Sequence, residues 1–210
     1  LFTHINNNIF SALLGRFYTI QQAGYYSQGS KWTTMGYSTI FGMINSVGQP
    51  VFREASEDRQ RLQNIFRKLM RFTAFVSFPA MLGLAIVSQE LIVISITEKW
   101  LPCVPVMQIL CVWGAFMPIS TLYSNLMNSI GRPNVYMWNT IALGIFQLLC
   151  VWGSYPYGLN IMLIVYTAAN IFWLLIWHYF AHKHIGISLL NTLKDIAPYL
   201  IISVAVMTFT

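Results

Sequence analysis

Two basic residues have positions that suit contact with a phosphate group. Arg16 follows an apolar segment, Leu1 to Leu14, that contains no Lys, Arg, Asp or Glu, and Lys31 precedes another apolar segment. A guanidinium donates a forked pair of hydrogen bonds to phosphate oxygens, and an ammonium adds a compact positive charge. Arg16 and Lys31 are therefore candidate ligand contacts. The alternative is that their long side chains only reach the water at the edge of an apolar layer.

Neutral amide side chains form a second group of candidates, because amides both donate and accept hydrogen bonds and so suit sugar hydroxyls. Polar residues inside apolar segments that could bond sugar hydroxyls include Asn6, Asn7, Asn8, Asn45, Gln49, Tyr123, Asn125 and Asn128. Asn125 and Asn128 are three residues apart and share one helix face, whereas Tyr123 and Asn125 do not. We retain Asn45, Gln49, Asn125 and Asn128 as ligand candidates. Hydrogen bonding between helices, at about 1 kcal/mol or less for each bond, is the alternative role.

Two further sets of titratable residues are interpreted as structural. Glu90 is the acidic residue deepest in an apolar segment, where a carboxylate could bind a proton or a sodium ion, but it lies near the end of that segment. This place favours a simple interfacial charge. His178 and His182 have the i, i+4 spacing of a metal-binding pair. Their position beside Lys183 and His184 favours a basic anchor at a helix end.

No catalytic, metal or cofactor site is predicted. The three cysteines show no CxxC spacing and lie in apolar stretches, which argues against both zinc and a disulfide framework. They are Cys103, Cys111 and Cys150. Neither a Ser/His/Asp set nor a Gly-rich phosphate loop is present, so the sequence gives no positive case for an enzyme.

The composition indicates that lipid solvates the elements that must position these residues. Hydrophobic residues make up 56% of the chain and charged residues only 9%, against roughly 25% charged in a soluble domain. The mean hydropathy is +0.58. The net charge of +6 does not indicate nucleic-acid binding, because the basic residues lie in short loops between apolar runs.

The hydrophobic pattern predicts an all-α, polytopic transmembrane bundle. Backbone groups in lipid must hydrogen-bond within their own segment, which favours helices of about 20 residues. About seven segments are present: Leu1 to Leu14, Thr33 to Phe52, Phe72 to Thr97, Pro105 to Ile130, Val135 to Gly153, Leu159 to Ala181 and Ile196 to Thr210. We expect the first and last to be partial, and residues 1–210 to be one transmembrane domain that is truncated at both ends.

The distribution of basic residues predicts the orientation of these segments. Nine of the 12 Lys and Arg residues fall in the second, fourth and sixth loops: Arg53, Arg59, Arg61, Arg67, Lys68, Arg71, Arg132, Lys183 and Lys194. The other three, Arg16, Lys31 and Lys99, fall in or beside the odd loops. Because basic loops stay in the cytoplasm, the even loops are predicted to be cytoplasmic, with strict alternation of the segments.

A cytoplasmic amphipathic helix is predicted near residues 57–72. Leu62, Ile65, Phe66 and Leu69 recur at helical spacing, and basic residues flank them. Such a helix lies at the membrane surface with its apolar face in the lipid. Ser56 is the expected N-cap. An ordinary solvated connector is the alternative.

Three short motifs coincide with the predicted turns. They are Ala23-Gly24-Tyr25-Tyr26 with Lys31-Trp32, then Glu98-Lys99-Trp100-Leu101-Pro102 before Val104-Pro105-Val106, then Gly131-Arg132-Pro133-Asn134. Together with Gln49-Pro50-Val51-Phe52 and Gln108-Ile109-Leu110, they resemble the Wzx-like polysaccharide-transport flippases of the multidrug, oligosaccharidyl-lipid and polysaccharide exporter superfamily. The likeness extends over nearly the whole chain. It departs at Thr97, where the family usually has Gly.

The resemblance implies a function and a set of partners. It implies the C-terminal half of a flippase of the bacterial cytoplasmic (inner) membrane that moves lipid-linked oligosaccharide, such as O-antigen or capsular repeat units, by alternating access. The implied partners are an undecaprenyl-diphosphate-linked oligosaccharide, membrane lipid and a missing N-terminal bundle of the same protein, with no nucleic acid.

Other functions remain open at this point. A drug or cation antiporter of the same superfamily would require acidic cavity residues, of which only Glu90 is available. An integral-membrane enzyme of polysaccharide biosynthesis would commonly carry a large outer loop, whereas the outer loops here are short. A membrane scaffold without transport activity is a further alternative.

Overall fold

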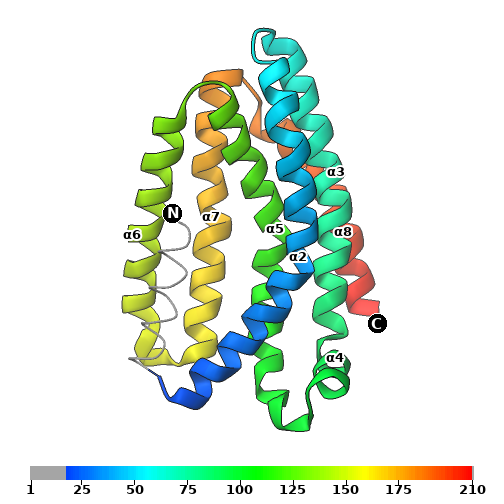
Figure 1. Cartoon of the computed structure of the whole chain (residues 1–210), viewed down its shortest axis with the longest axis vertical. Coiled ribbons are helices and arrows are strands. Elements are labelled where there is room, and N and C mark those ends of the chain that lie inside the picture. Colours follow the sequence, from blue (N-terminus) through cyan, green and yellow to red (C-terminus); the bar gives the residue numbers. More distant parts are fainter. Residues whose placement is uncertain (1–17, 210) are drawn as a thin grey trace.

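The structure, a computed structural model, describes residues 18–209. This part of the chain consists of α-helices and two short 3₁₀ turns, without strands (Figure 1). The elements are α2 (Ile20–Glu54), α3 (Arg59–Ile86), α4 (Ser88–Ser95), η1 (Glu98–Cys103), α5 (Val104–Ser129), α6 (Pro133–Ser154), η2 (Tyr155–Tyr157), α7 (Leu159–Ile185) and α8 (Leu189–Phe209). The predicted first segment, Leu1 to Leu14, lies outside the described residues.

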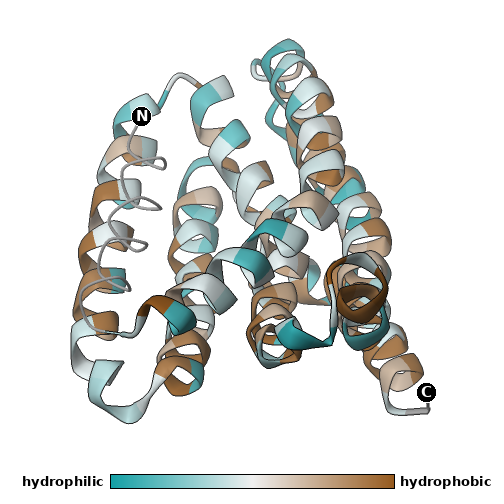
Figure 2. Cartoon of the chain, turned by 60° about the horizontal axis from the view of Figure 1, so that its bottom comes forward, coloured by the Kyte–Doolittle hydropathy of each residue, from teal (hydrophilic) through white to brown (hydrophobic). Residues whose placement is uncertain are grey.

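Within residues 18–209, five helical stretches, which do not include α2 and its predicted segment Thr33 to Phe52, are long and apolar enough to cross a membrane, which confirms the predicted polytopic all-α fold. They are Arg59–Ile86, Glu98–Ser129, Pro133–Tyr157, Leu159–Ile185 and Leu189–Thr208. Hydrophobic residues run along the lengths of the helices, and hydrophilic residues gather near their ends (Figure 2). On α6, Trp138, Leu149 and Trp152 are all at least 60% exposed, as expected for side chains that face lipid.

The helices alternate in direction, as predicted. The α2–α3, α5–α6 and α7–α8 turns lie at one end of the bundle, and the start of α2, the α4–η1 segment and the α6–α7 turn lie at the other (Figure 1). The first end carries the nine basic residues of the even loops, and we call it the basic end. That the basic end faces the cytoplasm stays a prediction.

Helix α2 begins earlier than predicted. Residues 23–32 belong to the helix and not to a loop, because Thr19 caps it and forms a capping box with Gln22. The Gln22 backbone N–H donates to Thr19 Oγ1 at 3.3 Å, and the Thr19 backbone N–H donates to Gln22 Oε1 at 3.2 Å. The helix contains 35 residues, which corresponds to about 52 Å at 1.5 Å per residue.

The amphipathic segment 57–72 is not a separate helix. Helix α3 runs without interruption from Arg59 to Ile86, and Asp58 caps it in place of the predicted Ser56. Leu62 and Phe66 are almost fully buried, so the apolar face of this segment packs inside the protein. The predicted segment Phe72 to Thr97 is divided, because α3 ends at Ile86 and the short helix α4 follows.

The last helix is longer than the predicted partial segment. Helix α8 begins at Leu189, and its first two turns contain Lys194 and Asp195, which interrupted the apolar pattern. Asp195 is buried because Arg67 of α3 neutralises it through two hydrogen bonds, Nε to Oδ2 at 2.7 Å and Nη2 to Oδ1 at 3.1 Å. Arg71 Nε lies 3.4 Å from Oδ1 of the same carboxylate.

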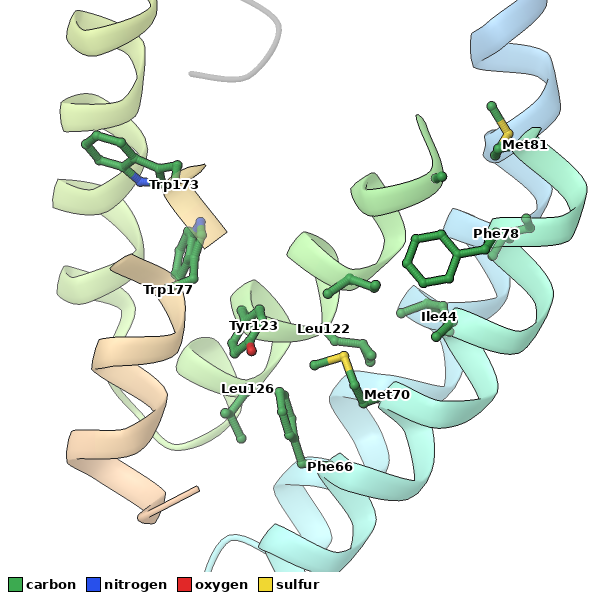
Figure 3. Close-up of a cluster of buried hydrophobic side chains, with 14 of the residues drawn as sticks. Ile44, Phe66, Met70, Phe78, Met81, Leu122, Tyr123, Leu126, Trp173 and Trp177 are labelled. Atoms are coloured by element: carbon green, nitrogen blue, oxygen red, sulfur yellow. The ribbon is translucent and has the colours of Figure 1, made fainter. Parts of the chain in front are cut away.

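The hydrophobic core lies where α3 packs against α5 and α2. Phe66 and Met70 of α3 point toward Leu122 and Leu126 of α5 (Figure 3). All four side chains are at most 1% exposed. Helix α2 approaches α5 closely at Gly29, where a Cβ atom would lie 3.1 Å from the Met107 backbone nitrogen. Small residues permit such close helix contacts in a membrane.

Candidate functional site

A polar cleft lies among α2, α5, α6 and α7, on the side of α5 away from α3. Its volume is about 330 Å³. Its lining residues come from all four helices: Tyr37, Phe41, Asn45, Gln49, Trp113, Met117, Ser120, Thr121, Ser124, Asn125, Asn128, Tyr136, Thr140, Leu143, Gln147, Tyr166, Asn170 and Trp177. We call this space the polar cleft.

The lining of the polar cleft has a distinct chemical character. Six of its residues carry amides, four carry aliphatic hydroxyls and six are aromatic, while no Asp, Glu, Lys, Arg or His is among them. Amides and hydroxyls exchange hydrogen bonds with neutral polar groups, and aromatic rings cover apolar faces. The polar cleft therefore suits a neutral ligand that has both hydroxyl groups and apolar faces.

The predicted amides of α2 and α5 meet at the wall of the polar cleft nearest the basic end. Asn125 Nδ2 donates to Asn45 Oδ1 at 3.1 Å, and Gln49 Nε2 donates to Asn125 Oδ1 at 3.3 Å. Asn125 is only 3% exposed, whereas Gln49 is exposed, and Asn128 lies one turn further along α5. Four of the six predicted ligand residues thus lie together, and three of them also bond helix to helix.

The opposite wall was not predicted. Gln147 of α6 donates to Asn170 Oδ1 of α7 at 2.8 Å, and Asn170 Nδ2 donates to the Tyr166 carbonyl oxygen at 2.7 Å. Both amides lie within apolar segments, which is the signal that identified Asn45 and Asn125. The sequence does not reveal, however, that α6 and α7 face α2 and α5 across one space.

Aromatic rings extend the polar cleft toward the other end of the bundle. A smaller cavity of about 120 Å³ shares Tyr37, Trp113 and Tyr166 with the polar cleft. Its remaining lining residues are Tyr26, Ser30, Thr33, Thr34 and Leu110. The two cavities together follow α2 from Gln49 to Tyr26, so polar and aromatic side chains mark a path along much of this helix.

Of the two predicted phosphate contacts, only Lys31 lies within the described residues, and it is not part of the polar cleft. Lys31 is exposed on α2 and lines neither cavity. Arg16, like Asn6, Asn7 and Asn8, lies outside the described residues. Glu90 is exposed in the first turn of α4, as expected for an interfacial charge.

The histidines and Tyr123 make contacts away from the polar cleft. Tyr123 Oη lies 3.2 Å from His178 Nδ1 in the buried core, and His182 Nδ1 lies 2.8 Å from the Ile187 carbonyl oxygen. Between residues 18 and 209, no group of three or more His, Cys, Asp or Glu residues could hold a metal ion. The cysteines Cys103, Cys111 and Cys150 are free thiols.

The three motifs predicted to form turns lie in different kinds of element in the structure. Gly131-Arg132-Pro133-Asn134 forms the α5–α6 turn, with Gly131 at φ 72°. Glu98 to Cys103 forms η1, directly before α5. Thr97, which stands where the resemblance favours Gly, has φ 163°, an extended backbone that any residue adopts. The motif at residues 23–26 lies inside α2.

Comparisons with known proteins agree with the resemblance drawn from these motifs. The family described as "Polysaccharide biosynthesis protein" matches residues 1–105. The chain is 28% identical over 147 residues to an uncharacterized membrane protein in the cps region of Klebsiella pneumoniae. It is 27% identical to the lipopolysaccharide biosynthesis protein WzxC of Escherichia coli (strain K12), and 25% identical to the teichuronic acid biosynthesis protein TuaB of Bacillus subtilis (strain 168), over the same length.

Each of these matches covers 70% of this chain but only 30% of the relative. No solved structure matches the chain significantly. The family match extends over half of the 210 residues, and the membrane-spanning helices fit relatives that include a membrane protein. The chain therefore belongs to the polysaccharide biosynthesis protein family and is a multi-pass protein of the bacterial cytoplasmic membrane.

Proposed function

We propose that the full-length protein moves a lipid-linked oligosaccharide across the membrane, and that the polar cleft receives part of the saccharide. The composition of the cleft is the observation that carries this proposal. Sugars present hydroxyl groups at their edges and C–H groups on their faces, and the cleft pairs amides and hydroxyls with aromatic rings. Its volume of about 330 Å³ is at the small end of the usual range for ligand sites, about 300–1,000 Å³.

The position of the polar cleft fits alternating access. In such transporters the ligand site lies within the membrane, and the two bundles rock around it. The cleft residues span α5 from Trp113 to Asn128, which are 15 residues apart, or about 22 Å along the helix. The chain provides one wall of such a route, and we propose that the other wall belongs to an N-terminal bundle of the same protein.

The phosphate contacts are a separate part of the proposal. Arg16 and Lys31 lie toward the end of the bundle opposite the basic end in the predicted topology, so they would meet a diphosphate there and not inside the polar cleft. Arg16 offers the forked pair of donors that a diphosphate favours, and Lys31 is exposed about three turns into α2.

The lining also bears on two of the other candidate functions, the cation antiporter and the enzyme. A cation antiporter requires carboxylates to compensate the desolvated charge of its ligand, and no carboxylate lines the polar cleft. The relatives' names refer to polysaccharide biosynthesis, which is compatible with an enzyme as well as with a transporter. The polar cleft lacks acid and base residues other than tyrosine, and so we favour transport.

The double variant Gln147→Leu/Asn170→Leu of the full-length protein tests this proposal. It removes both partners of one hydrogen bond, so that neither amide is left without its partner. Gln21→Leu/Asn160→Leu is the control, because it makes the same substitutions on α2 and α7 at exposed positions that do not line the polar cleft. The assay is surface polysaccharide in a strain that lacks the gene, together with protein abundance in membranes.

The proposal predicts that the cleft variant accumulates like the wild type and restores much less polysaccharide. Two lost ligand hydrogen bonds of about 1 kcal/mol each weaken saccharide binding by about 30-fold. The control should restore the wild-type amount. If the cleft variant restores wild-type polysaccharide at wild-type abundance, the polar cleft is not part of the saccharide route.

A further inference from the structure

A second polar site lies on the outer face of α3 and α8, near the basic end and away from the polar cleft. It is a shallow cavity of about 500 Å³. Its lining consists of Asn64, Arg67, Lys68, Arg71 and Tyr199, and we call it the basic groove. None of these residues lines the polar cleft.

Helix geometry concentrates charge in the basic groove. Asn64, Arg67, Lys68 and Arg71 follow the spacing i, i+3, i+4, i+7, so they share one face of α3. The separation of seven residue steps between Asn64 and Arg71 corresponds to about 10 Å along the helix axis. Three positive charges therefore stand within two turns of one helix.

Asp195 of α8 holds two of these cations in place but does not neutralise all three. It bonds Arg67 through both carboxylate oxygens and lies 3.4 Å from Arg71 Nε. The side chain of Arg67 stays 34% exposed and that of Arg71 51% exposed, with N–H groups that Asp195 does not use. Among the described residues, Lys68 forms no ion pair.

The turn of helix that follows the basic groove is apolar and exposed. Phe72 is 54% exposed and Phe75 59% exposed, and on α8 Ile202 is 60% exposed. The Phe75 and Tyr199 rings meet edge to face, with centroids 5.7 Å apart. Phe75 lies about one turn farther from the basic end than Arg71. No charged residue occurs in α3 after Arg71. The surface thus changes from basic to apolar within about one turn.

This change matches the boundary between the headgroups and the acyl chains of a membrane. We propose that the basic groove binds the phosphate of an anionic membrane phospholipid, whose acyl chains lie along Phe72, Phe75 and Ile202. Arg71 and Lys68 supply charge and N–H donors to the phosphate oxygens, and Asp195 keeps the two guanidinium groups side by side. A soluble anion would not contact the exposed apolar turn, whereas a phospholipid contacts both the basic groove and this turn. The two features together therefore favour a lipid.

Lipid binding to the purified full-length protein tests this inference. Native mass spectrometry would measure the affinity for phosphatidylglycerol and for phosphatidylcholine with the same acyl chains. Lys68→Gln/Arg71→Gln removes two cations of the groove and leaves the Arg67–Asp195 pair intact. Arg53→Gln/Lys183→Gln is the control, because it removes two exposed cations of the basic end that lie outside the groove.

The wild type is expected to prefer phosphatidylglycerol. The groove variant should lose about 30-fold in this affinity, since each basic residue near an anionic surface contributes about fivefold. Phosphatidylcholine binding should not change in the groove variant, and the control should keep the wild-type preference. Excess inorganic phosphate should not displace the lipid.

Three results would overturn the inference. They are an unchanged affinity in the groove variant, an equal loss in the control, which would indicate diffuse attraction, and displacement by inorganic phosphate, which would indicate a soluble anion site. If the double variant does not fold, Lys68→Gln alone serves in its place, because Lys68 makes no ion pair and its loss should still lower the affinity about fivefold.

Discussion

At the scale of single residues, Asn125 contributes both to the packing of two helices and to the proposed ligand site. It is the central member of the α2–α5 amide network, with one hydrogen bond to Asn45 and one to Gln49, and it also lines the polar cleft. A side chain in this position stabilises the helix pair in the absence of ligand and can exchange its partners when ligand arrives. The two roles that the sequence left open for these amides are therefore compatible.

Replacing Asn125 by Ala should lower the thermal stability of the full-length protein. Two interhelical hydrogen bonds are lost, at about 0.6 kcal/mol each in a membrane protein, and a buried side chain leaves a small cavity. Asn128→Ala should have a much smaller effect, because Asn128 is only partly buried. Melting curves in detergent provide the measurement, and equal melting temperatures of wild type and Asn125→Ala would show that the network contributes no stability.

The residues that could be predicted share one property. Asn45, Gln49, Asn125 and Asn128 are polar residues in apolar segments, and this contrast is visible in the sequence. Gln147 and Asn170 show the same contrast, but their partnership depends on which helices meet. The spacing of residues fixes a face within one helix and does not fix which helix packs against that face.

At the scale of elements, some helix bounds are predictable because Pro and Gly lie at the helix ends. The predicted segments 105–130 and 135–153 agree within two residues with α5 and α6, because Pro105, Gly131 and Pro133 mark their ends. The apolar pattern predicts a start of α2 that is 13 residues too late, because the capping box of Thr19 and Gln22 lies in a polar stretch. The sequence pattern predicts two segments where α3 is one helix, because the basic residues of its first half are typical of a helix at the membrane surface.

The contact between α3 and α8 depends on Asp195, and this dependence gives a prediction. Asp195→Asn should destabilise the protein by about 1–3 kcal/mol, because it leaves two arginine side chains facing each other without a counter-charge. The matched variant Glu54→Gln removes the carboxylate of the exposed Arg61–Glu54 pair, and it should cost much less.

Thermal melting of both variants checks this difference. The α7–α8 turn provides a local measurement of the same contact, because α3 also holds this turn in place. Arg59 Nε donates to the Ile185 carbonyl oxygen at 3.1 Å, and Gln63 donates to the same oxygen. Proteolysis at this turn should increase in Asp195→Asn and not in Glu54→Gln. Equal effects of the two substitutions would contradict a stabilising role of the buried carboxylate.

At the scale of the whole molecule, the alternating helices place the second, fourth and sixth loops together at the basic end. That this end faces the cytoplasm is a prediction from the distribution of charge. Cysteines introduced at Ser56 and Asn134 should be protected from an impermeant thiol reagent in intact cells. A cysteine at Tyr157, which is 68% exposed at the other end, should react. Ser154 is unsuitable as a reporter, since it is buried. The reverse labelling pattern would invert the orientation.

We propose that the full-length protein moves a lipid-linked saccharide and that the polar cleft is part of the route. The most direct measurement is the transfer of a fluorescent lipid-diphosphate-linked saccharide between the leaflets of vesicles that contain the purified full-length protein, followed with an impermeant quencher. Wild-type vesicles should make the inner pool accessible faster than protein-free vesicles, and Gln147→Leu/Asn170→Leu should slow this transfer. If transfer with folded wild-type protein is no faster than in protein-free vesicles, the protein does not move this saccharide.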